Sequence, residues 1–599
     1  MQGLILAAGM GKRLKELTQN NTKCMVKVNG VTLIDRMLHQ LDGCGLERVV
    51  IVVGYEGKKL IDYISTLSIR TPIVYVENPV YDRTNNIYSL FLAKDKLLED
   101  DTVLLESDVI FEDSVLRELL DDPRPTLALV DKYESWMDGT CVKLSEDDRI
   151  EAFVPGSKFL FSDIPEYYKT VNLYKFSKDF SRYYYVPFLD AYSQALGNNE
   201  YYEQVLRVIT MLDDPQIRAK KLTGQKWYEI DDEQDLDIAS SIFAPTIEQK
   251  AQALQSRYGG YWRYPHMLDF CYLVNPYFPP RRLVDEMKAS FDTLLTQYPS
   301  GMRVNSLLAA KNFGVHRNHI VVGNGAAELI KCLVESLQGA TGVVRPTFEE
   351  YPNRLHCPEV VFTPDNNDYS YTADDLMDFF GQHPVENLVL INPDNPSGNY
   401  IPKADVLRLA EWCQKREIRF VLDESFVDFA DEEDSSCIRE DILRRFPTML
   451  VMKSISKSYG VPGIRLGVLA SADEQRIAAM KKEVAIWNIN SFGEFYMQIE
   501  EKYHKDYLAG LVKLRQERGR FQRELAALPG VRVIPSQANY VMVELLGGCK
   551  ASELTARLLE KDVLVKDLSG KLNGRQYLRL AVRNTEDNDR LLNALRAAL

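Results

Sequence analysis

A lysine beside two serines is the strongest candidate for covalent chemistry in the C-terminal part of the sequence. The segment runs Ser454-Ile455-Ser456-Lys457, and Arg465 follows it. A lysine in such a setting can form a Schiff base with an aldehyde cofactor. Arg465, Ser454 and Ser456 supply the hydrogen bonds that hold a phosphate group. We therefore predict a covalent cofactor site at Lys457.

Three further segments carry residues suited to the rest of such a cofactor. Asp423 ends the apolar stretch Phe420–Leu422, where a buried carboxylate can pair with a protonated pyridine nitrogen. Asn395, in Asn-Pro-Asp-Asn-Pro-Ser-Gly, offers a donor to the phenolic oxygen of such a ring. Backbone N–H groups that follow a predicted strand and begin a helix can bind the phosphate, namely those of Gly325, Ala326 and Ala327. Phe348 either stacks on the ring or packs in the core.

The N-terminal part carries a different set of phosphate-binding residues. Gly9 and Gly11 follow the apolar run Leu4–Ala7, so backbone N–H groups can approach phosphate oxygens without hindrance from a Cβ atom. Arg13 adds a charge-assisted contact, and Lys23 follows at a distance suited to reaching a phosphate. A tight turn between a strand and a helix explains the glycines equally well when they are taken alone.

Two aspartates at predicted strand ends are suited to a magnesium ion. Asp108 comes just after the apolar stretch Val103–Leu105, and Asp231 lies in Trp-Tyr-Glu-Ile-Asp-Asp. Hard cations such as Mg²⁺ prefer carboxylate oxygens, and ligands bind at strand ends in open α/β sheets. The alternative for Asp231 is a helix N-cap. His316 and His319 form an isolated HxxH that no matching cysteine or acidic set accompanies in the sequence, which argues against a second metal site.

The elements that must position these residues alternate between short apolar strands and amphipathic helices. This alternation predicts an α/β protein with doubly wound parallel sheets. The chain of 599 residues exceeds a single hydrophobic core. We expect one domain over 1–243, a linker over 244–264 that ends in Gly-Gly-Tyr-Trp, and a second domain over 265–599.

The composition excludes several classes of protein. The chain is 45% hydrophobic and 26% charged with a net charge of −14, and no basic block is present, so a nucleic-acid partner is not expected. Its nine cysteines are scattered without a CxxC, which indicates reduced thiols. No apolar run approaches the roughly 18 residues of a membrane span. We expect a cytoplasmic protein without a membrane partner.

The N-terminal motifs together resemble the nucleotidyltransferases that make NDP-sugars and CDP-activated headgroups. The segment Leu6-Ala7-Ala8-Gly9-Met10-Gly11-Lys12-Arg13 matches their nucleotide-binding loop, and Lys23, Asp108 and Asp231 match the lysine and metal-binding aspartates. Segments 78–89 and 169–174 are similar to the phosphocholine-type cytidylyltransferases. The resemblance implies a Rossmann-like fold with a mixed, mostly parallel sheet, with CTP as substrate and catalysis by Lys23 and Arg13. Thr22 stands where the family usually has proline.

The identity of the headgroup stays open at this stage. Trp136, Tyr133, Trp227 and Tyr228 can line a pocket for a quaternary ammonium through cation–π attraction, or they pack in the core. A carboxylate such as Asp138 or Glu229 suits a primary ammonium better.

The C-terminal motifs together resemble the fold-type I pyridoxal-phosphate (PLP) enzymes, in the branch of histidinol-phosphate aminotransferase and threonine-phosphate decarboxylase. The resemblance implies a large domain with a seven-stranded sheet, a small α+β domain and a homodimer. It implies that Tyr298 reaches the cofactor phosphate of the neighbouring subunit and that Arg579 and Arg583 bind acid groups of the substrate. Surface ion pairs are the alternative for both arginines. Phe426 stands where many aminotransferases have tyrosine, which echoes the decarboxylases.

The order of the two halves resembles the fusions of a 2-aminoethylphosphonate cytidylyltransferase with a transaminase. This resemblance implies that the C-terminal half makes 2-aminoethylphosphonate from phosphonoacetaldehyde and an amino donor, and that the N-terminal half converts it to CMP-2-aminoethylphosphonate. The first alternative is decarboxylation of phosphoserine or phosphothreonine, coupled to activation of phosphoethanolamine or phosphocholine. The second is a regulator in which a degenerate domain only senses nucleotide; retention of Lys23, Asp108, Asp231 and Lys457 argues against it.

Overall fold

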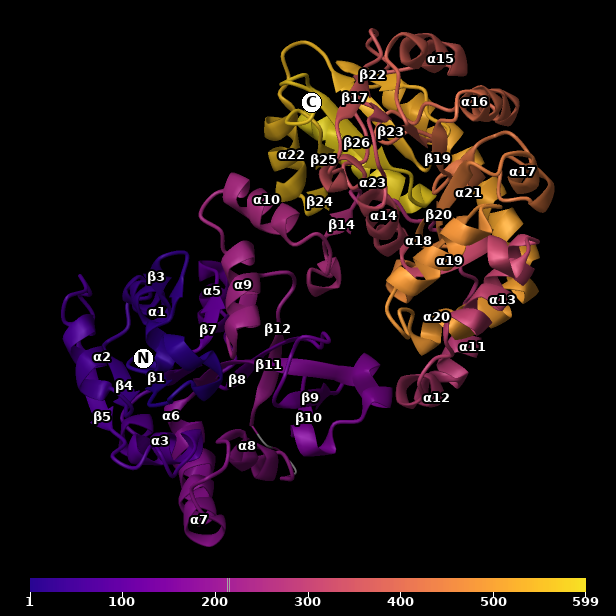
Figure 1. Ribbon diagram of the computed structural model, residues 1–599. Coiled ribbons are helices and arrows are strands. Elements are labelled where there is room, and N and C mark those ends of the chain that lie inside the picture. The colour runs from indigo at the N-terminus through magenta and orange to yellow at the C-terminus, as the bar shows by residue number, and fades with distance from the viewer. Residues whose placement is uncertain (213, 215) are drawn as a thin grey trace. The chain divides into compact units, whose positions relative to one another are not determined.

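The chain divides into two compact units, which are described separately. The computed structural model describes residues 1–212, 214 and 216–599, and its units are Met1–Arg263 and Tyr264–Leu599 (Figure 1). The segment expected to be a linker contains α10 (Ile247–Ser256) and a short 3-10 helix, Tyr261–Arg263. α10 packs against α9 (Glu233–Ile242) within the first unit. Among the described residues, no helix has both the length and the apolar sequence that crossing a membrane requires.

A mixed sheet forms the centre of the first unit. Its strands lie in the order β10-β9-β11-β6-β1-β4-β5, and β8 pairs with β11 and with β12. Parallel pairing joins β6, β1, β4 and β5, whereas β11 runs antiparallel to β6, β8 and β9. The strands are β1 (Gln2–Ala7), β4 (Val49–Val53), β5 (Ile73–Glu77), β6 (Thr102–Glu106), β8 (Leu127–Lys132), β9 (Cys141–Leu144), β10 (Ile150–Val154), β11 (Tyr167–Phe176) and β12 (Arg218–Lys221).

Helices cover both faces of this sheet. Leu4 and Leu6 of β1 contribute to one hydrophobic core and Ile5 and Ala7 to the other, because alternate residues of a strand face opposite sides. Two short strands, β7 (Val109–Phe111) and β13 (Trp227–Glu229), pair beside the C-terminal end of β6. The other elements are β2 (Lys27–Val28), β3 (Val31–Thr32), α1 (Leu33–Asp42), α2 (Gly57–Ile64), α3 (Asn86–Leu92), α4 (Lys94–Leu97), α5 (Asp113–Leu120), α6 (Lys178–Phe180), α7 (Val186–Leu196) and α8 (Glu203–Ile209).

The second unit has the large and small sheets that its sequence motifs imply. The large sheet has seven strands in the order β15-β21-β20-β19-β18-β16-β17, and only β21 runs antiparallel to its neighbours. The small sheet has the order β22-β23-β26-β25. Alternate residues of the central strand again serve two cores, Val421 on one side and Phe420 and Leu422 on the other.

Several polar residues that the sequence singled out in this unit, such as Asp423 and Ser454, lie at the C-terminal ends of strands. The strands are β14 (Leu268–Asp269), β15 (Ile320–Asn324), β16 (Thr341–Val344), β17 (Glu359–Phe362), β18 (Asn387–Ile391), β19 (Arg419–Asp423), β20 (Met449–Ser454), β21 (Leu466–Ala470), β22 (Val531–Ile534), β23 (Tyr540–Leu545), β24 (Val563–Leu564), β25 (Lys566–Asp567) and β26 (Tyr577–Ala581). The helices are α11 (Arg281–Ala289), α12 (Phe291–Thr296), α13 (Met302–Phe313), α14 (Ala326–Glu335), α15 (Ala373–Gln382), α16 (Lys403–Lys415), α17 (Glu440–Arg445), α18 (Ile455–Ser458), α19 (Glu474–Glu483), α20 (Ser491–Ile499), α21 (His504–Ala526), α22 (Ala551–Glu560) and α23 (Thr585–Ala598).

Candidate active sites

The glycine loop after β1 is held tightly against the residues that follow it. Gly11 lies in the left-handed region with φ of 59°, where a Cβ atom would stand 3.0 Å from the Thr18 methyl group and 3.1 Å from Lys23 Cβ. Glycine is therefore required here, both for its conformation and for space. Thr22 holds φ at −74°, the value that a proline ring fixes, so its departure from the usual proline leaves the backbone in place.

Lys23 lies between the two aspartates that the sequence singled out. Its Nζ stands 2.5 Å from Asp108 Oδ2 and 2.7 Å from Asp231 Oδ1, and Arg13 Nη2 is 2.8 Å from the same Asp231 oxygen. Burial lowers the pKa of Lys23, but the two carboxylates outweigh this effect and hold the pKa above its ordinary value. The fold thus brings together Arg13, Lys23, Asp108 and Asp231, which are up to 218 residues apart in the chain.

The donor set at this point fits a hard divalent cation. Carboxylate oxygens of Asp108, Glu229 and Asp231 lie within 4.8 Å of one another, and Asp108 Oδ1 is buried without a hydrogen-bond partner. Mg²⁺ binds such oxygens. Glu229 was expected only as a possible headgroup ligand, and the structure shows it beside the predicted metal pair.

A second layer of carboxylates lies behind these aspartates. Glu106 ends β6 two residues before Asp108, and Glu229 ends β13 two residues before Asp231, so the same Glu-x-Asp spacing occurs at both strand ends. Asn86 Nδ2 donates to Glu106 Oε1 at 2.8 Å. Asn172 Nδ2 donates to Glu229 Oε1 at 3.2 Å, and Lys169 Nζ lies 3.4 Å from Glu229 Oε2.

Glu203, at the start of α8, joins this layer and has a buried Oε2 without a hydrogen-bond partner. Burial raises the pKa of Glu106 well above its ordinary value, and Asp108, Glu203 and Glu229 raise it further. Burial raises the pKa of Glu229 to about 7 against the opposing effect of Lys169. Sequence reasoning missed Glu106 and Glu203; the repeated Glu-x-Asp spacing was the available signal for Glu106.

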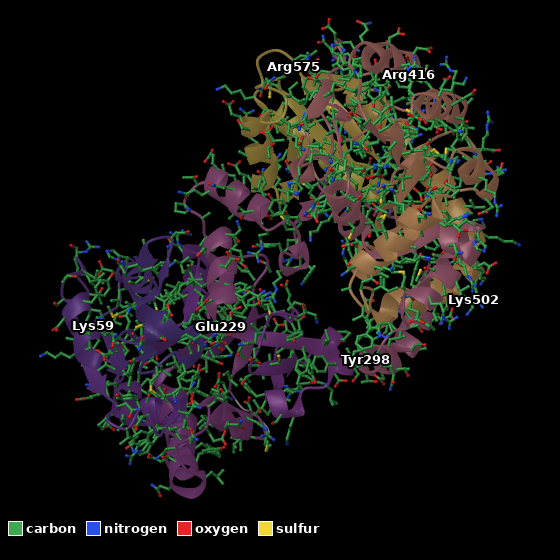
Figure 2. The ribbon with its side chains drawn as sticks, viewed as in Figure 1. Lys59, Glu229, Tyr298, Arg416, Lys502 and Arg575 are labelled. Atoms are coloured by element: carbon green, nitrogen blue, oxygen red, sulfur yellow. The ribbon has the colours of Figure 1, made fainter. Side chains whose placement is uncertain are left out.

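The aromatic residues expected near the headgroup form a packed group. Trp136 stacks on Tyr228 with ring centroids 4.1 Å apart and also contacts Trp227, and both partners are buried. Tyr133 contacts Phe159. Asp138 is exposed, 3.9 Å from Arg13 Nη1. Figure 2 shows Glu229 among the side chains of this unit.

In the second unit, Lys457 lies on α18, directly after β20. Burial lowers the pKa of its amine to about 8, and the charges of Arg579 and Arg465 lower it further, while Asp423 opposes them. A buried amine with a lowered pKa is a competent nucleophile toward an aldehyde. Asp423 ends β19, with 3% of its surface exposed.

A tyrosine that sequence reasoning missed holds Asp423 in place. Tyr351 donates its hydroxyl hydrogen to Asp423 Oδ2 at 2.8 Å, and the Ser425 N–H donates to Oδ1 at the same distance. Burial raises the pKa of the Asp423 carboxyl, and these hydrogen bonds oppose the rise. Tyr351 lies 72 residues before Asp423 and only three after Phe348, a spacing that gives no indication of the contact.

The turn after β15 forms a cradle for a phosphate group. Gly325 has φ of +74°, and a Cβ atom there would lie 2.3 Å from Arg465 Nη2. The Gly325 N–H donates to Arg465 O at 3.0 Å, and Ala326 and Ala327 begin α14. Ser456 Oγ is buried without a hydrogen-bond partner. A buried, unpaired hydroxyl on one segment, and a helix N-terminus packed against Arg465 on another, are the kinds of group that bind the phosphate of PLP.

Arg579 and Asn395 form the other side of this site. Arg579 Nη1 donates to Asn395 Oδ1 at 2.7 Å, and its Nε is buried without a partner. Arg583 instead pairs with Asp587 at 2.8 Å and donates to Asp269 O. Arg579 therefore lies in the site, whereas Arg583 is engaged in the kind of ion pair that was its alternative.

The remaining predicted residues are more exposed. Phe348 is 42% exposed. Tyr298, labelled in Figure 2, is 80% exposed. The centroid of its ring lies 4.6 Å from that of Trp487. Phe426 is buried and meets Tyr540 edge to face at 5.1 Å. A tyrosine hydroxyl is thus absent from the position three residues after Asp423.

Comparison with known proteins agrees with this geometry. Residues 275–595 match the family described as aminotransferase class I and II. The chain belongs to this family. Residues 3–147 match the MobA-like NTP transferase domain, so the class I and II aminotransferase region is fused to a nucleotidyltransferase domain.

Three similar proteins place the chain among its relatives. It is 33% identical to CMP-5'-(3-aminopropyl)phosphonate synthase of Streptomyces rubellomurinus, over 99% of this chain and 94% of that protein. It is 33% identical to L-serine phosphate decarboxylase of Sulfurospirillum multivorans, over 55% of this chain and 88% of that protein. A solved decarboxylase from Sulfurospirillum multivorans matches with a TM-score of 0.52 and 31% identity, over 57% of this chain and 90% of that one. The fusion expected from the sequence, and the fold-type I architecture, are confirmed.

Proposed function

We propose that this chain is a bifunctional enzyme that makes and activates an amine-bearing headgroup. The second unit forms the amine with PLP, and the first unit transfers the cytidylyl group of CTP to a phosphonate or phosphate oxygen of the product. The best candidate for the acceptor is 2-aminoethylphosphonate. The observation that carries the proposal is the buried layer of Glu106, Glu203 and Glu229 beside the Lys23 site, which favours an acceptor with a positive charge.

The reaction of the first unit is a displacement at phosphorus. A phosphonate oxygen of the acceptor forms a bond to the α-phosphorus of CTP, and the bond to the β-phosphate oxygen breaks, with its electrons leaving on pyrophosphate. Catalysis of this type depends on positioning and charge neutralisation. The loop at Gly9 and Gly11 would hold the phosphates, Lys23 and Arg13 would neutralise the developing charge, and Asp108 and Asp231 would hold Mg²⁺.

The carboxylate layer of Glu106, Glu203 and Glu229 would make the first unit select acceptors that carry an amine over acceptors that lack one. Glu106 and Glu203 carry raised pKa values because burial disfavours their charged forms, and an incoming ammonium group would offset that cost. A relative that matches 99% of the chain is named for the CMP conjugate of 3-aminopropylphosphonate, and aminopropylphosphonate is an acceptor of this chemical class. Choline, with a quaternary ammonium, would instead need open aromatic faces, but Trp227 and Tyr228 are buried.

The second unit has the residues that PLP chemistry requires. When bound, PLP withdraws electrons from the substrate carbon next to the nitrogen, so that a bond to that carbon can break. Lys457 would hold the cofactor aldehyde, Asp423 would keep the pyridine nitrogen protonated, and Asn395 would orient the ring oxygen. Arg579, with an unpaired Nε, would bind an acid group of the substrate. We further propose a homodimer in which the exposed Tyr298 reaches the site of the partner subunit.

Two routes to the amine are distinguishable. Decarboxylation of a phosphorylated or phosphonate amino acid is supported by Phe426 and by similarity to the serine phosphate decarboxylase of Sulfurospirillum multivorans. Transamination of phosphonoacetaldehyde is supported by the match to the aminotransferase family. Decarboxylation is the better supported, because the decarboxylase shares 33% identity over 88% of its length.

The first test measures pyrophosphate release by the full chain with CTP, Mg²⁺ and matched acceptors. We expect 2-aminoethylphosphonate to react at least tenfold more efficiently than ethylphosphonate, which lacks the amine. Glu203→Gln should reduce the ratio of the efficiency with 2-aminoethylphosphonate to that with ethylphosphonate, while leaving the KM for CTP unchanged. The control is Glu200→Gln, which changes an exposed residue. Equal rates for both acceptors would refute the role of the carboxylate layer, and no release with any acceptor would refute cytidylyl transfer.

The second test separates the two routes of the PLP half. Phosphoserine and its phosphonate analogues are incubated with the PLP-loaded protein, and released CO₂ is measured. In parallel, phosphonoacetaldehyde is supplied with alanine, and pyruvate is measured. CO₂ without pyruvate supports decarboxylation, whereas pyruvate without CO₂ establishes transamination.

A further inference from the structure

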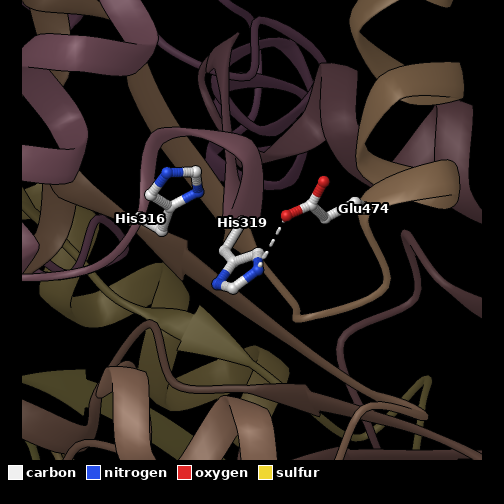
Figure 3. A group of neighbouring side chains, drawn as sticks. All are labelled: His316, His319 and Glu474. Carbon is white, nitrogen blue, oxygen red and sulfur yellow. Dashed lines mark ion pairs between the residues drawn. The ribbon is translucent and has the colours of Figure 1, made fainter.

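A second group of metal-ligating side chains lies in the PLP unit, away from its cofactor cradle. His316 is the N-cap of the 3-10 turn that leads into β15, His319 is the last residue of that turn, and Glu474 is the first residue of α19. One ligand atom from each of these three residues lies within 4.8 Å of the other two (Figure 3). The sequence showed the HxxH without an acidic partner, and the fold supplies that partner from 155 residues further along the chain.

The hydrogen bonds around His319 orient it as a metal ligand. Its Nδ1 lies 3.1 Å from Glu440 Oε2, and its Nε2 lies 3.4 Å from Glu474 Oε1. Glu440 Oε2 also accepts from the His316 N–H at 2.8 Å, and Glu440 Oε1 accepts from Arg444 Nε at 2.6 Å, so this carboxylate is held in place beside His319. A carboxylate that accepts from one imidazole nitrogen leaves the lone pair of the other nitrogen available, as in the carboxylate–histidine–zinc arrangement.

The other two residues each keep one ligand atom available. The Asn318 N–H donates to His316 Nδ1 at 3.4 Å, which leaves Nε2 for a ligand. Asn318 Nδ2 donates to Glu474 Oε2 at 3.3 Å, which leaves Oε1 facing His319. Both His316 and Glu474 are exposed, so water can complete the coordination of a bound ion.

The separation of the two central atoms suits a tetrahedral ion. Ligands about 2.0–2.2 Å from one zinc ion stand roughly 3.3–3.6 Å apart in a tetrahedral site. The distance from His319 Nε2 to Glu474 Oε1, 3.4 Å, already lies in that range. The ligand atom of the exposed His316 lies within 4.8 Å of both. With neutral imidazoles, Glu474 and Glu440 also balance the two positive charges of the ion.

We propose that His316, His319 and Glu474 bind a divalent transition metal ion, with Zn²⁺ as the best fit, and that Glu440 is the positioning residue for His319. The site lies at the start of β15, whereas the phosphate cradle at Gly325 lies beyond the end of the same strand, about 16 Å away along five residues. The ion therefore has a structural role: it ties the turn before β15 to the starts of α17 and α19.

The test is a Zn²⁺ titration by calorimetry of the PLP-loaded full chain, previously treated with a chelator, in excess Mg²⁺. Mg²⁺ prefers oxygen ligands and binds imidazole poorly, so in excess it would compete for the carboxylates of the first unit and not for the histidines. We expect one Zn²⁺ per chain that His316→Asn and Glu474→Gln abolish, and a higher thermal midpoint in wild type with Zn²⁺. Co²⁺ should give the visible absorption of a tetrahedral site. His356→Asn, which changes an exposed histidine elsewhere in the unit, is the matched control.

Glu440→Gln separates a positioning role from a merely structural one. It should weaken Zn²⁺ binding about tenfold to hundredfold without abolishing it. The proposal is overturned if wild type binds no Zn²⁺ under these conditions, or if His316→Asn binds as tightly as His356→Asn. In either case His319 is only the centre of an ion-pair group between Glu440 and Glu474.

Discussion

Removing one hydroxyl group from Tyr351 gives the sharpest test of the cofactor site. Tyr351 and Asp423 are 1% and 3% exposed, and the hydroxyl donates to the carboxylate at 2.8 Å. A hydrogen bond to a charged group contributes about 1.5–3 kcal/mol. Without it, the pKa of Asp423 should rise further, because the hydroxyl group stabilises the charged form of the carboxyl. A less ionised carboxylate pairs more weakly with a protonated pyridine nitrogen.

The expected result for Tyr351→Phe is a weakening of PLP affinity by about tenfold to hundredfold. The assay titrates the cofactor-free protein with PLP and follows the visible absorbance of the bound cofactor. Tyr507→Phe is the control, because Tyr507 donates to Asp428 Oδ2 over the same 2.8 Å distance but does not contact Asp423. If both variants bind PLP as wild type does, Tyr351 does not support the pyridine partner. If both lose affinity equally, general destabilisation is the cause.

Three further predictions concern single residues. The pKa of Lys457 is about 8 in the folded protein, against an ordinary value of 10.5. Between pH 8 and pH 10.5 the unfolded chain therefore binds more protons at this lysine than the folded protein does. The free energy of unfolding of the cofactor-free protein should accordingly increase as the pH rises from 8 to 10.5. Thermal melts across that range should show the gain in wild type and not in Lys457→Met; parallel curves would contradict it. Gly325→Ala should lower PLP affinity about tenfold or more, because its Cβ meets Arg465, whereas Gly570→Ala has open space and should bind normally. Lys23→Met should reduce pyrophosphate release about 100-fold to 1000-fold, since a charge at the reacting phosphate is lost; the exposed Lys58→Met is its control, and comparable activity of the two variants would rule out a catalytic role.

Local sequence patterns were sufficient for several central strands and for the polar residues that follow them. Apolar runs such as 103–105 and 420–422 predicted β6 and β19, and the polar residues that follow them face the sites. This succeeds because the C-terminal ends of parallel strands share one edge of a sheet, whatever the order of the strands. The sequence could not tell which of Arg579 and Arg583 lies in the site, because both arginines belong to the same short motif. The structure shows that Arg579 donates to Asn395, whereas Arg583 pairs with Asp587.

The sequence by itself determined the two domain types of this protein and the residues for which we propose a chemical role: a glycine loop with a lysine and two aspartates, and a lysine with an aspartate at a strand end. Only the tertiary structure decided which distant residues complete each site. Tyr351 donates a hydrogen bond to Asp423, Glu203 lies near the carboxylates behind Asp108, and Glu474 lies 3.4 Å from His319. The physical reason is that such contacts depend on strand order and on the path of the connecting helices, which bring together residues too far apart for any periodicity to relate them.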